Sequence, residues 1–402
     1  MIVIAGRYST AKVMIDNIEN EAYRQIEEIV NHPSFTGNVV IMPDCHTGIG
    51  SVIGFTMPMT DKVIPNTIGV DIGCGMVSVN IGKVKKLKLE KIDSAIRSRI
   101  PMGFEVHKRP KIEIETAFDW NGLNKRFGIV RRKIEKVIGK THYKGEAYSP
   151  SFIERKSVEI GIDFKKTVNS IGTLGGGNHF IEIGKSLITD DIWLTVHSGS
   201  RHFGFCVANY HQKKAKAYTS SKGIKVKKGL EYLEGELLLD YFFDMLFAQE
   251  YARVNRNTMI EILLDILGND IQDRVESVHN YIDMDDLIIR KGAIRSYKGE
   301  RMIIPFNMRD GLLICEGKSN PDWNFSAPHG AGRVMGRREA KRRLSLERFK
   351  KQMKGIVSSS VCRSTLDEAP DAYKQPELIE NAIKPTAIVV DRIKPLLNVK
   401  AK

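Results

Sequence analysis

The sequence has few cysteines and no long apolar run, and both absences exclude classes of protein. The five cysteines among its 402 residues are odd in number and unevenly spaced, at positions 45, 74, 206, 315 and 362. A disulfide framework is therefore not expected, and a reducing compartment suits these thiols. No window holds the roughly 18 apolar residues of a membrane span, and the N-terminal MIVIAGRYSTAKV lacks the pattern of a secretory signal. We expect a cytoplasmic protein with no membrane partner.

Positive charge, in contrast, is abundant. The 62 Lys and Arg residues exceed the 48 Asp and Glu residues, which gives a formal net charge of +14. Such a charge supports nucleic acid as a partner class without naming one. The cations gather in three runs, at residues 83–91, 125–136 and 337–351. Each run alone is more often a solvated surface than a nucleic-acid contact.

Alternating short apolar runs and longer helical patterns predict an α+β protein. Strands are expected where apolar runs are bounded by Gly, Pro and Asp, at 38–42, 51–57, 76–81, 179–184, 192–199, 286–290, 301–306 and 312–317. Helices are expected where apolar residues recur every three or four positions, at about 18–31, 118–138, 230–267, 333–354 and 376–397. No repeat or linker divides the chain, so residues 1–402 are predicted to form one large domain of mixed sheets with flanking helices.

The stretch VDIGCGM places Asp71 and Cys74 three positions apart, with glycines at 69, 73 and 75. This spacing needs a turn, because a strand would bring residues two positions apart to one face. The glycines permit positive φ values, and the two side chains offer a hard oxygen and a soft sulfur to metals. A thiolate can bind two cations at once. Taken alone, the stretch is also compatible with a structural turn around a buried, inert thiol.

The histidines lie in compact polar contexts. In GTLGGGNHFIE three consecutive glycines precede Asn178 and His179, and Glu182 follows on a predicted strand. VHSGSR ends another predicted strand at His197, and VHNY contains His279. Any one of these could be an ordinary buried histidine, but their grouping favours metal ligation. A Ser/His nucleophile pair at VHSGSR ranks lower, because no G-x-S-x-G turn is present.

His329 lies in the small-residue turn APHGAGR, just before a very basic helical segment. The N-terminus of a helix favours a nearby anion. A neutral imidazole can attack phosphorus and form a phosphoramidate, which a second acceptor can displace. The alternative is a capping loop whose histidine has no chemical role.

Together these motifs resemble the RtcB family of RNA-splicing ligases, and the resemblance extends over nearly the whole chain. The matching motifs occur in the family's order: MPDCHTGIGSVIG (42–54), IGVDIGCGM (68–76), GTLGGGNHFIEI (172–183), VHSGSR (196–201), VHNY (278–281), HGAGRVMGR (329–337), DEAPDAYK (367–374) and the terminal VKAK. The resemblance implies an RtcB-like fold and an enzyme that uses two Mn²⁺ ions and GTP. It also implies substrates: RNA with a 2′,3′-cyclic phosphate or 3′-phosphate, and RNA with a 5′-hydroxyl.

The resemblance also implies residue roles. His329 matches the histidine that becomes guanylylated. The expected metal ligands are Asp71, Cys74, His179, His197 and His279, with Cys74 as the bridge. The expected nucleotide-binding residues are Asn178, Phe180, Glu182, Asn307, Gly330, Ala331, Gly332, Tyr373 and Lys400.

One segment departs from the family pattern. PFNMRDGLL (305–313) stands where the family carries a GSMG-type loop, so Asn307 replaces a serine and Arg309 and Asp310 add charge. The terminal VKAK replaces VKG. These changes put nucleotide selectivity in question, and they keep two alternatives open: a metal-dependent RNA-end phosphoesterase that has lost ligation, and a non-catalytic RNA-binding protein. An archease-like activator is a further expected partner.

Overall fold

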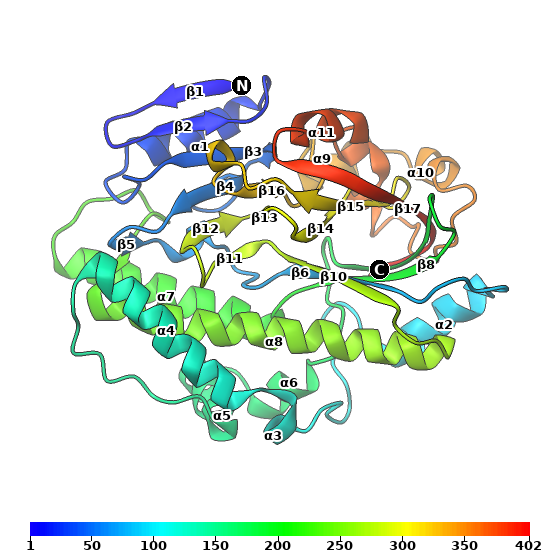
Figure 1. Cartoon of the computed structure of the whole chain (residues 1–402), viewed down its shortest axis with the longest axis horizontal. Coiled ribbons are helices and arrows are strands. Elements are labelled where there is room, and N and C mark those ends of the chain that lie inside the picture. Colours follow the sequence, from blue (N-terminus) through cyan, green and yellow to red (C-terminus); the bar gives the residue numbers. More distant parts are fainter.

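The computed structural model describes residues 1–402, and two large sheets form its frame (Figure 1). The six-stranded sheet has the order β1 (Ile2–Ala5), β2 (Thr10–Val13), β3 (Val39–His46), β4 (Ile53–Pro58), β12 (Ile288–Lys291) and β11 (Asn280–Ile282). The seven-stranded sheet has the order β10 (Asp273–Val278), β6 (Gly75–Asn80), β8 (Ile192–Ser198), β7 (Phe180–Ser186), β17 (Ala387–Val399), β15 (Leu312–Gly317) and β14 (Arg301–Pro305). Two short pairs complete the sheets: β13 (Ala293–Arg295) with β16 (Ser326–Pro328), and β5 (Lys62–Val63) with β9 (Leu233–Glu234).

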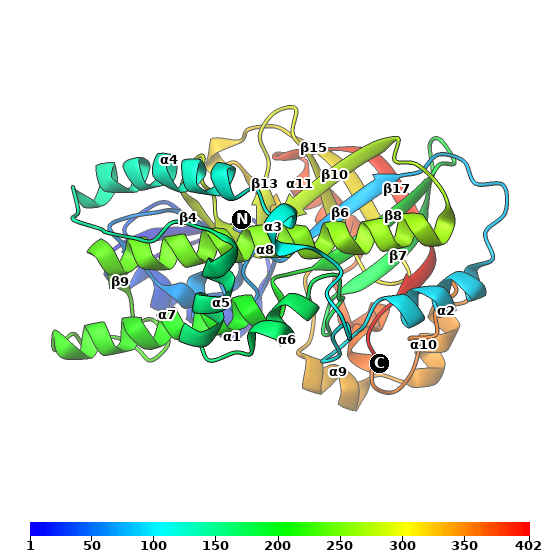
Figure 2. The same cartoon turned by 90° about the horizontal axis from the view of Figure 1, so that it is seen from below.

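Helices flank the sheets, and the longest of them forms part of the main core. Helix α8 (Gly235–Leu267) contacts α7 (Arg201–Ser221), α4 (Trp120–Ile138) and strand β8 (Figures 1 and 2). Its buried residues lie all around the helix, as expected of a helix covered on every side. The remaining helices are α1 (Asn20–Val30), α2 (Leu89–Arg99), α3 (Ile114–Ala117), α5 (Pro150–Glu159), α6 (Phe164–Asn169), α9 (Arg337–Arg343), α10 (Leu346–Gln352) and α11 (Pro376–Ile383). None of the helices combines the length and apolar character needed to cross a bilayer.

The expected α+β class is confirmed, and each predicted strand overlaps an observed one. The helix predicted over 376–397 is wrong beyond Ile383: Pro385 follows the end of α11, and residues 387–399 form strand β17. Pro385 disfavours helical backbone at the residue before it, and the β-branched run AIVVD suits a strand. Pairing with both β7 and β15 then satisfies the backbone of β17. Helix α7, which begins at the last residue of the VHSGSR motif, was not predicted.

We expect Leu246→Ala in α8 to lower the free energy of unfolding by about 2–5 kcal/mol, because Leu246 is 1% exposed in the largest apolar cluster and its truncation leaves a cavity. Leu187→Ala is the matched control, since Leu187 is 58% exposed after β7. Urea unfolding of both variants measures the difference. Equal stabilities would show that α8 is not part of the cooperative core.

Candidate active site

Four neighbouring strands of the seven-stranded sheet, β10, β6, β8 and β7, each have one terminus at the same end of the sheet. Gly75, at the start of β6, pairs with Val278 at the end of β10. On its other side, Gly75 pairs with Ser198 at the end of β8. Phe180, at the start of β7, pairs with His197 of β8. Residues next to these pairs therefore meet at one end of the sheet.

These positions carry the predicted metal ligands. Cys74 directly precedes β6, His179 directly precedes β7 and His279 directly follows β10. His197 is the next-to-last residue of β8. Asp71 joins them from a tight turn in which the Cys74 N–H donates to the Asp71 carbonyl at 3.1 Å. All five predicted ligands are thus brought together.

Their donor atoms form two groups that share one sulfur. Cys74 Sγ lies 3.4 Å from Nε2 of both His179 and His197. His179 Nε2 lies 2.8 Å from Asp71 Oδ2, and His197 Nε2 lies 3.3 Å from His279 Nε2. Within each triplet, Asp71 with Cys74 and His179, and Cys74 with His197 and His279, the donor atoms lie within 4.8 Å of one another. This arrangement fits a thiolate shared by two cations.

The atoms at His179 also fit a cation. Its Nδ1 lies 3.0 Å from the Leu174 carbonyl, to which it donates, so Nε2 is left with a lone pair. That lone pair faces the Asp71 carboxylate at 2.8 Å. Two acceptors at this distance repel each other unless a cation or proton lies between them. A carbonyl that orients a ligating imidazole in this way is usual at metal sites.

Burial controls the charge of the cluster. It raises the pKa of Cys74 well above the usual value, and the neighbouring Asp71 charge adds to this effect. It also lowers the pKa values of His197 and His279 well below the ordinary value, which keeps both imidazoles neutral and able to bind metal. Burial opposes ionisation of Asp71 as well, but when a proton lies between Asp71 and His179 the charge and hydrogen bond of that imidazole outweigh burial, and the pKa of Asp71 falls to about 2. A bound cation would supply the charge that the Cys74 thiolate needs.

Backbone packing leaves little freedom at the turn that carries Asp71. A Cβ atom on Gly199 would lie 2.1 Å from Asp71 Oδ1, so only glycine allows this approach. Arg256 of α8 is 1% exposed and donates to the carbonyls of Gly73 and Ser198 at 2.8 and 3.1 Å. One buried guanidinium thus fixes both the ligand turn and the end of β8.

His329 follows β16 and is oriented by a buried carboxylate. Its Nδ1 lies 2.6 Å from Oδ2 of Asp44, a fully buried residue of β3. Because a carboxylate only accepts, Nδ1 carries the proton and Nε2 keeps its lone pair. The rings of His329 and His279 are 4.8 Å apart between centroids. An imidazole nitrogen with a free lone pair therefore lies beside the predicted metal ligands.

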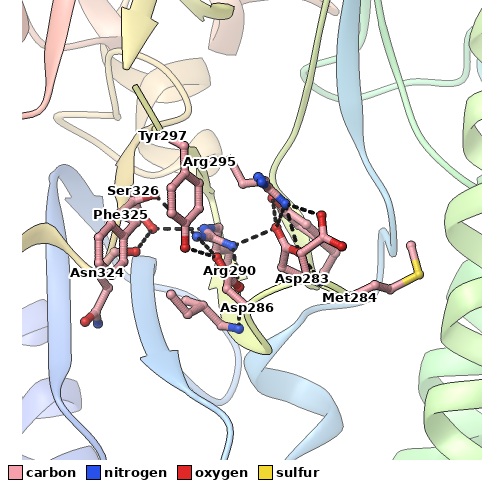
Figure 3. Close-up of polar contacts among 12 residues, drawn as sticks. Asp283, Met284, Asp286, Arg290, Arg295, Tyr297, Asn324, Phe325 and Ser326 are labelled. Carbon is pink, nitrogen blue, oxygen red and sulfur yellow. Dashed lines mark hydrogen bonds and ion pairs between the residues drawn. The ribbon is translucent and has the colours of Figure 1, made fainter. Parts of the chain in front are cut away.

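A buried ion network anchors the strand that leads to His329 (Figure 3). Arg290 of β12 donates to Ser326 Oγ of β16 at 2.9 Å. Its charge is balanced by Asp283 at 3.1 Å and Asp286 at 2.8 Å. Losing either partner of a buried pair is costly, so this network restrains the approach to His329.

One cavity is lined by both His197 and His329. Every residue predicted to bind the nucleotide also lines it, namely Asn178, Phe180, Glu182, Asn307, Gly330, Ala331, Gly332, Tyr373 and Lys400. The structure therefore brings the predicted nucleotide residues together next to the predicted metal ligands.

Glu182 and Lys400 line the cavity with different partners. Glu182 Oε2 accepts from Asn398 Nδ2 at 2.8 Å. Burial raises the pKa of Glu182 to about 8, although Asn398 and Lys400 act in the opposite direction. Lys400 Nζ donates to Glu368 at 2.9 Å and to the Asn178 carbonyl at 3.0 Å. The substitution of alanine for glycine after Lys400 has thus not removed this lysine from the cavity.

Asn307 lies in the cavity wall, but its amide is engaged in the turn between β14 and β15. Oδ1 accepts from the N–H groups of Arg309 and Asp310 at 3.0 and 3.1 Å, and Nδ2 donates to Asp310 Oδ2 at 2.8 Å. Such self-capping is a common reason for Asn in turns. The Arg309 and Asp310 charges also pair with each other at 2.7 Å. The altered loop is therefore an internally bonded turn.

The basic run on α4 lies away from the one that begins at α9, and part of the charge at α9 is compensated. Residues 125–136 belong to α4, which lies away from α9 in both views (Figures 1 and 2). The helix predicted over 333–354 consists of two short helices, α9 and α10. Arg337, which lines the cavity, pairs with Asp367 at 2.7 Å and with Glu368 at 2.5 Å. Only part of the positive charge at α9 is free for an anion.

Several site residues were not predicted from the sequence. Asp44 and His46 lie in the PDCH motif, for whose side chains the sequence predicted no role. His46 also lines the cavity. Glu368 lies within the DEAPDAYK motif, and Asn398 directly precedes the terminal VKAK. The contact between Asp44 and His329 spans 285 positions, so no local spacing could indicate it.

We expect Cys74→Ser to lower the Mn²⁺ content of the purified protein, because its sulfur belongs to both donor triplets. Elemental analysis after dialysis against Mn²⁺ measures the change. Cys206→Ser is the control and keeps the metal content, since Cys206 is half-buried on α7, outside both triplets. Unchanged stoichiometry in Cys74→Ser would contradict a shared thiolate.

Comparison with known proteins identifies the family of the chain. The family model described as "tRNA-splicing ligase RtcB" matches residues 25–401. The chain is 26% identical to the RNA-splicing ligase RtcB of Escherichia coli K12, over 95% of each chain. It is 22% identical to the tRNA-splicing ligase RtcB of Methanococcus maripaludis, over 99% of this chain and 95% of the other. It is 25% identical to the tRNA-splicing ligase RtcB of Archaeoglobus fulgidus, over 98% of this chain and 94% of the other. The chain therefore belongs to the RtcB family of RNA ligases and has the RtcB fold.

Proposed function

We propose that the protein joins RNA ending in a 2′,3′-cyclic phosphate or 3′-phosphate to RNA with a 5′-hydroxyl, using GTP and two Mn²⁺ ions, in RNA repair or splicing. The observation that carries this proposal is the placement of His329. Its Nε2 lone pair is directed by Asp44, and it shares one cavity with His197 of the metal cluster and with Glu182. Membership of the RtcB family supports the same proposal. The free thiols suit a protein of the cytoplasm, where we propose that it acts.

The chemistry proceeds by three displacements at phosphorus. Nε2 of His329 attacks the α-phosphorus of GTP, a P–N bond forms, and pyrophosphate leaves. An oxygen of the RNA 3′-phosphate then attacks that phosphorus, the P–N bond breaks, and GMP passes to the RNA end. Finally the 5′-hydroxyl attacks the RNA 3′-phosphorus, and GMP leaves as the new phosphodiester forms. A cyclic phosphate is first opened by water.

The residues of this chain have distinct roles in these steps. Asp44 holds the proton on Nδ1 of His329 and stabilises the positive charge that develops on the imidazole. Asp71, Cys74, His179, His197 and His279 would hold the two Mn²⁺ ions. When bound, such ions neutralise phosphate oxygens and orient the attacking and leaving groups.

RNA is the expected macromolecular partner. The net charge of +14 attracts its backbone, and binding should weaken as salt rises because counterions are released. The basic run of α9 and α10 starts with α9, eight residues after His329, so it is the basic run nearest in sequence to the proposed nucleophile. An archease-like activator is also proposed as a partner.

The altered loop motivates a second candidate function, a phosphoesterase that opens cyclic ends without ligation. The amide of Asn307 is engaged in the turn, so it offers the nucleotide less than a free side chain would. Cyclic-phosphate RNA incubated with and without GTP separates the two functions, because joined product requires GTP only for the ligase. A non-catalytic RNA-binding protein would give neither product.

We expect incubation with Mn²⁺ and α-labelled GTP to label the protein covalently, and His329→Ala to abolish the label because the attacking nitrogen is lost. Gel electrophoresis of the denatured protein measures it. His142→Ala is the control, since His142 is an exposed histidine outside the cavity, and it stays labelled. Covalent labelling of the His329→Ala protein would contradict the proposal that His329 is the nucleophile.

Guanine binding should strengthen with rising pH up to about 8. Glu182, whose pKa burial raises to about 8, is protonated below that pH in the empty cavity. The N–H donors of guanine favour the ionised carboxylate, so binding below pH 8 must release a proton. We expect GMP affinity to rise up to about tenfold per pH unit below 8 and then level off. Calorimetry in buffers of different ionisation enthalpy measures the proton release, and a flat profile would contradict this role of Glu182.

A further inference from the structure

Two buried oxygen atoms, on two of the residues that line the cavity, have no hydrogen-bond partner. They are Oε1 of Glu182 and Oδ1 of Asn398, and both residues are 2% exposed. Leaving a buried acceptor without a donor costs about 1–3 kcal/mol. Two such atoms on neighbouring side chains in a ligand cavity indicate that the ligand supplies the donors.

Sheet register brings these two side chains together. Asn398 of β17 is paired directly with Glu182 of β7 in an antiparallel ladder. Residues opposite each other in such a ladder point to the same face of the sheet. The side chains are therefore neighbours, and Nδ2 of Asn398 donates to Oε2 of Glu182 at 2.8 Å.

The chemistry of the pair decides what it presents to a ligand. In the ionised form that binds guanine, the Glu182 carboxylate only accepts, so the Asn398 amide turns its NH₂ group toward it and leaves Oδ1 free. The pair thus offers two neighbouring acceptors, Oε1 and Oδ1. Guanine has matching donors on one edge, the ring N1–H and the 2-amino group. Adenine has an acceptor at N1 and hydrogen in place of the 2-amino group.

We propose that Asn398 is a specificity-determining residue for guanine: its Oδ1 accepts from the 2-amino group while Glu182 accepts from N1–H. This inference rests on the proposed use of GTP. In this arrangement Asn398 also fixes the Glu182 carboxylate through the bond to Oε2. Nucleotide selectivity then resides at the β7–β17 pair, away from the altered turn that contains Asn307.

The test compares GMP with inosine monophosphate, which lacks only the 2-amino group. Calorimetry gives the dissociation constant of each nucleotide for the wild-type protein and for Asn398→Leu, which has a similar shape but no acceptor. We expect the wild type to prefer GMP, and Asn398→Leu to lose about 5- to 150-fold in GMP affinity. Its affinity for inosine monophosphate should change much less, so the preference collapses.

A purely structural role would weaken both nucleotides equally, and that result would overturn the proposal. A wild type that does not distinguish the two nucleotides, or binds neither, would overturn it as well. Asn398→Ala, tested by the thermal shift that each nucleotide induces, serves if the leucine variant does not fold. Lys394→Ala, an exposed position on the same strand, is the control and keeps the wild-type preference.

Binding and chemistry are read out separately. Selective GMP binding that depends on Asn398, without covalent labelling by GTP, would refute the proposed ligase chemistry and leave this inference standing. Covalent labelling that is equally efficient with GTP and inosine triphosphate, before and after Asn398→Leu, would refute this inference and leave the ligase standing.

Discussion

The contact of the Cys74 sulfur with two imidazole nitrogens joins the two halves of the candidate metal centre. Both distances are 3.4 Å, and they exist because β6, β7 and β8 lie side by side in one antiparallel register. A slip of one residue would turn each donor to the other face of the sheet. Arg256 of α8 restrains this register by donating hydrogen bonds to the carbonyls of Gly73 and Ser198. The site therefore depends on how α8 packs against the sheet.

Several charges that line the cavity are paired with each other. Glu368 is fully buried, and although burial opposes its ionisation, Lys400 and Arg337 outweigh that effect and lower its pKa to about 2. Glu368 and Asp367 in turn compensate those two cations. The high net charge of the chain thus overstates the attraction felt by an anion inside the cavity. Oriented groups such as His329 with Asp44, and not diffuse positive charge, distinguish this site chemically.

The proposed selectivity for the base lies at a different place from the departure in the sequence. The turn at Asn307 satisfies its own polar groups, so its unusual residues have a local structural explanation. The unpaired acceptors lie instead on β7 and β17. Residues up to 397 were predicted to be helical, so the pairing of β17 with β7 that sets Asn398 opposite Glu182 was not expected. A wrong element assignment thus concealed a candidate binding residue.

By itself, the sequence determined the α+β class, most of the strands, the glycine-shaped turn at Asp71 and Cys74, and the identities of the histidines, because these are properties of local pattern and side-chain chemistry. Only the tertiary structure decided that Asp44 orients His329, that Cys74 belongs to two donor groups and that Asn398 meets Glu182. Each of these relations joins residues far apart in the chain through strand register and burial. Sequence spacing carries no information on such contacts, since sheet pairing sets them and the packing of α8 holds them in place.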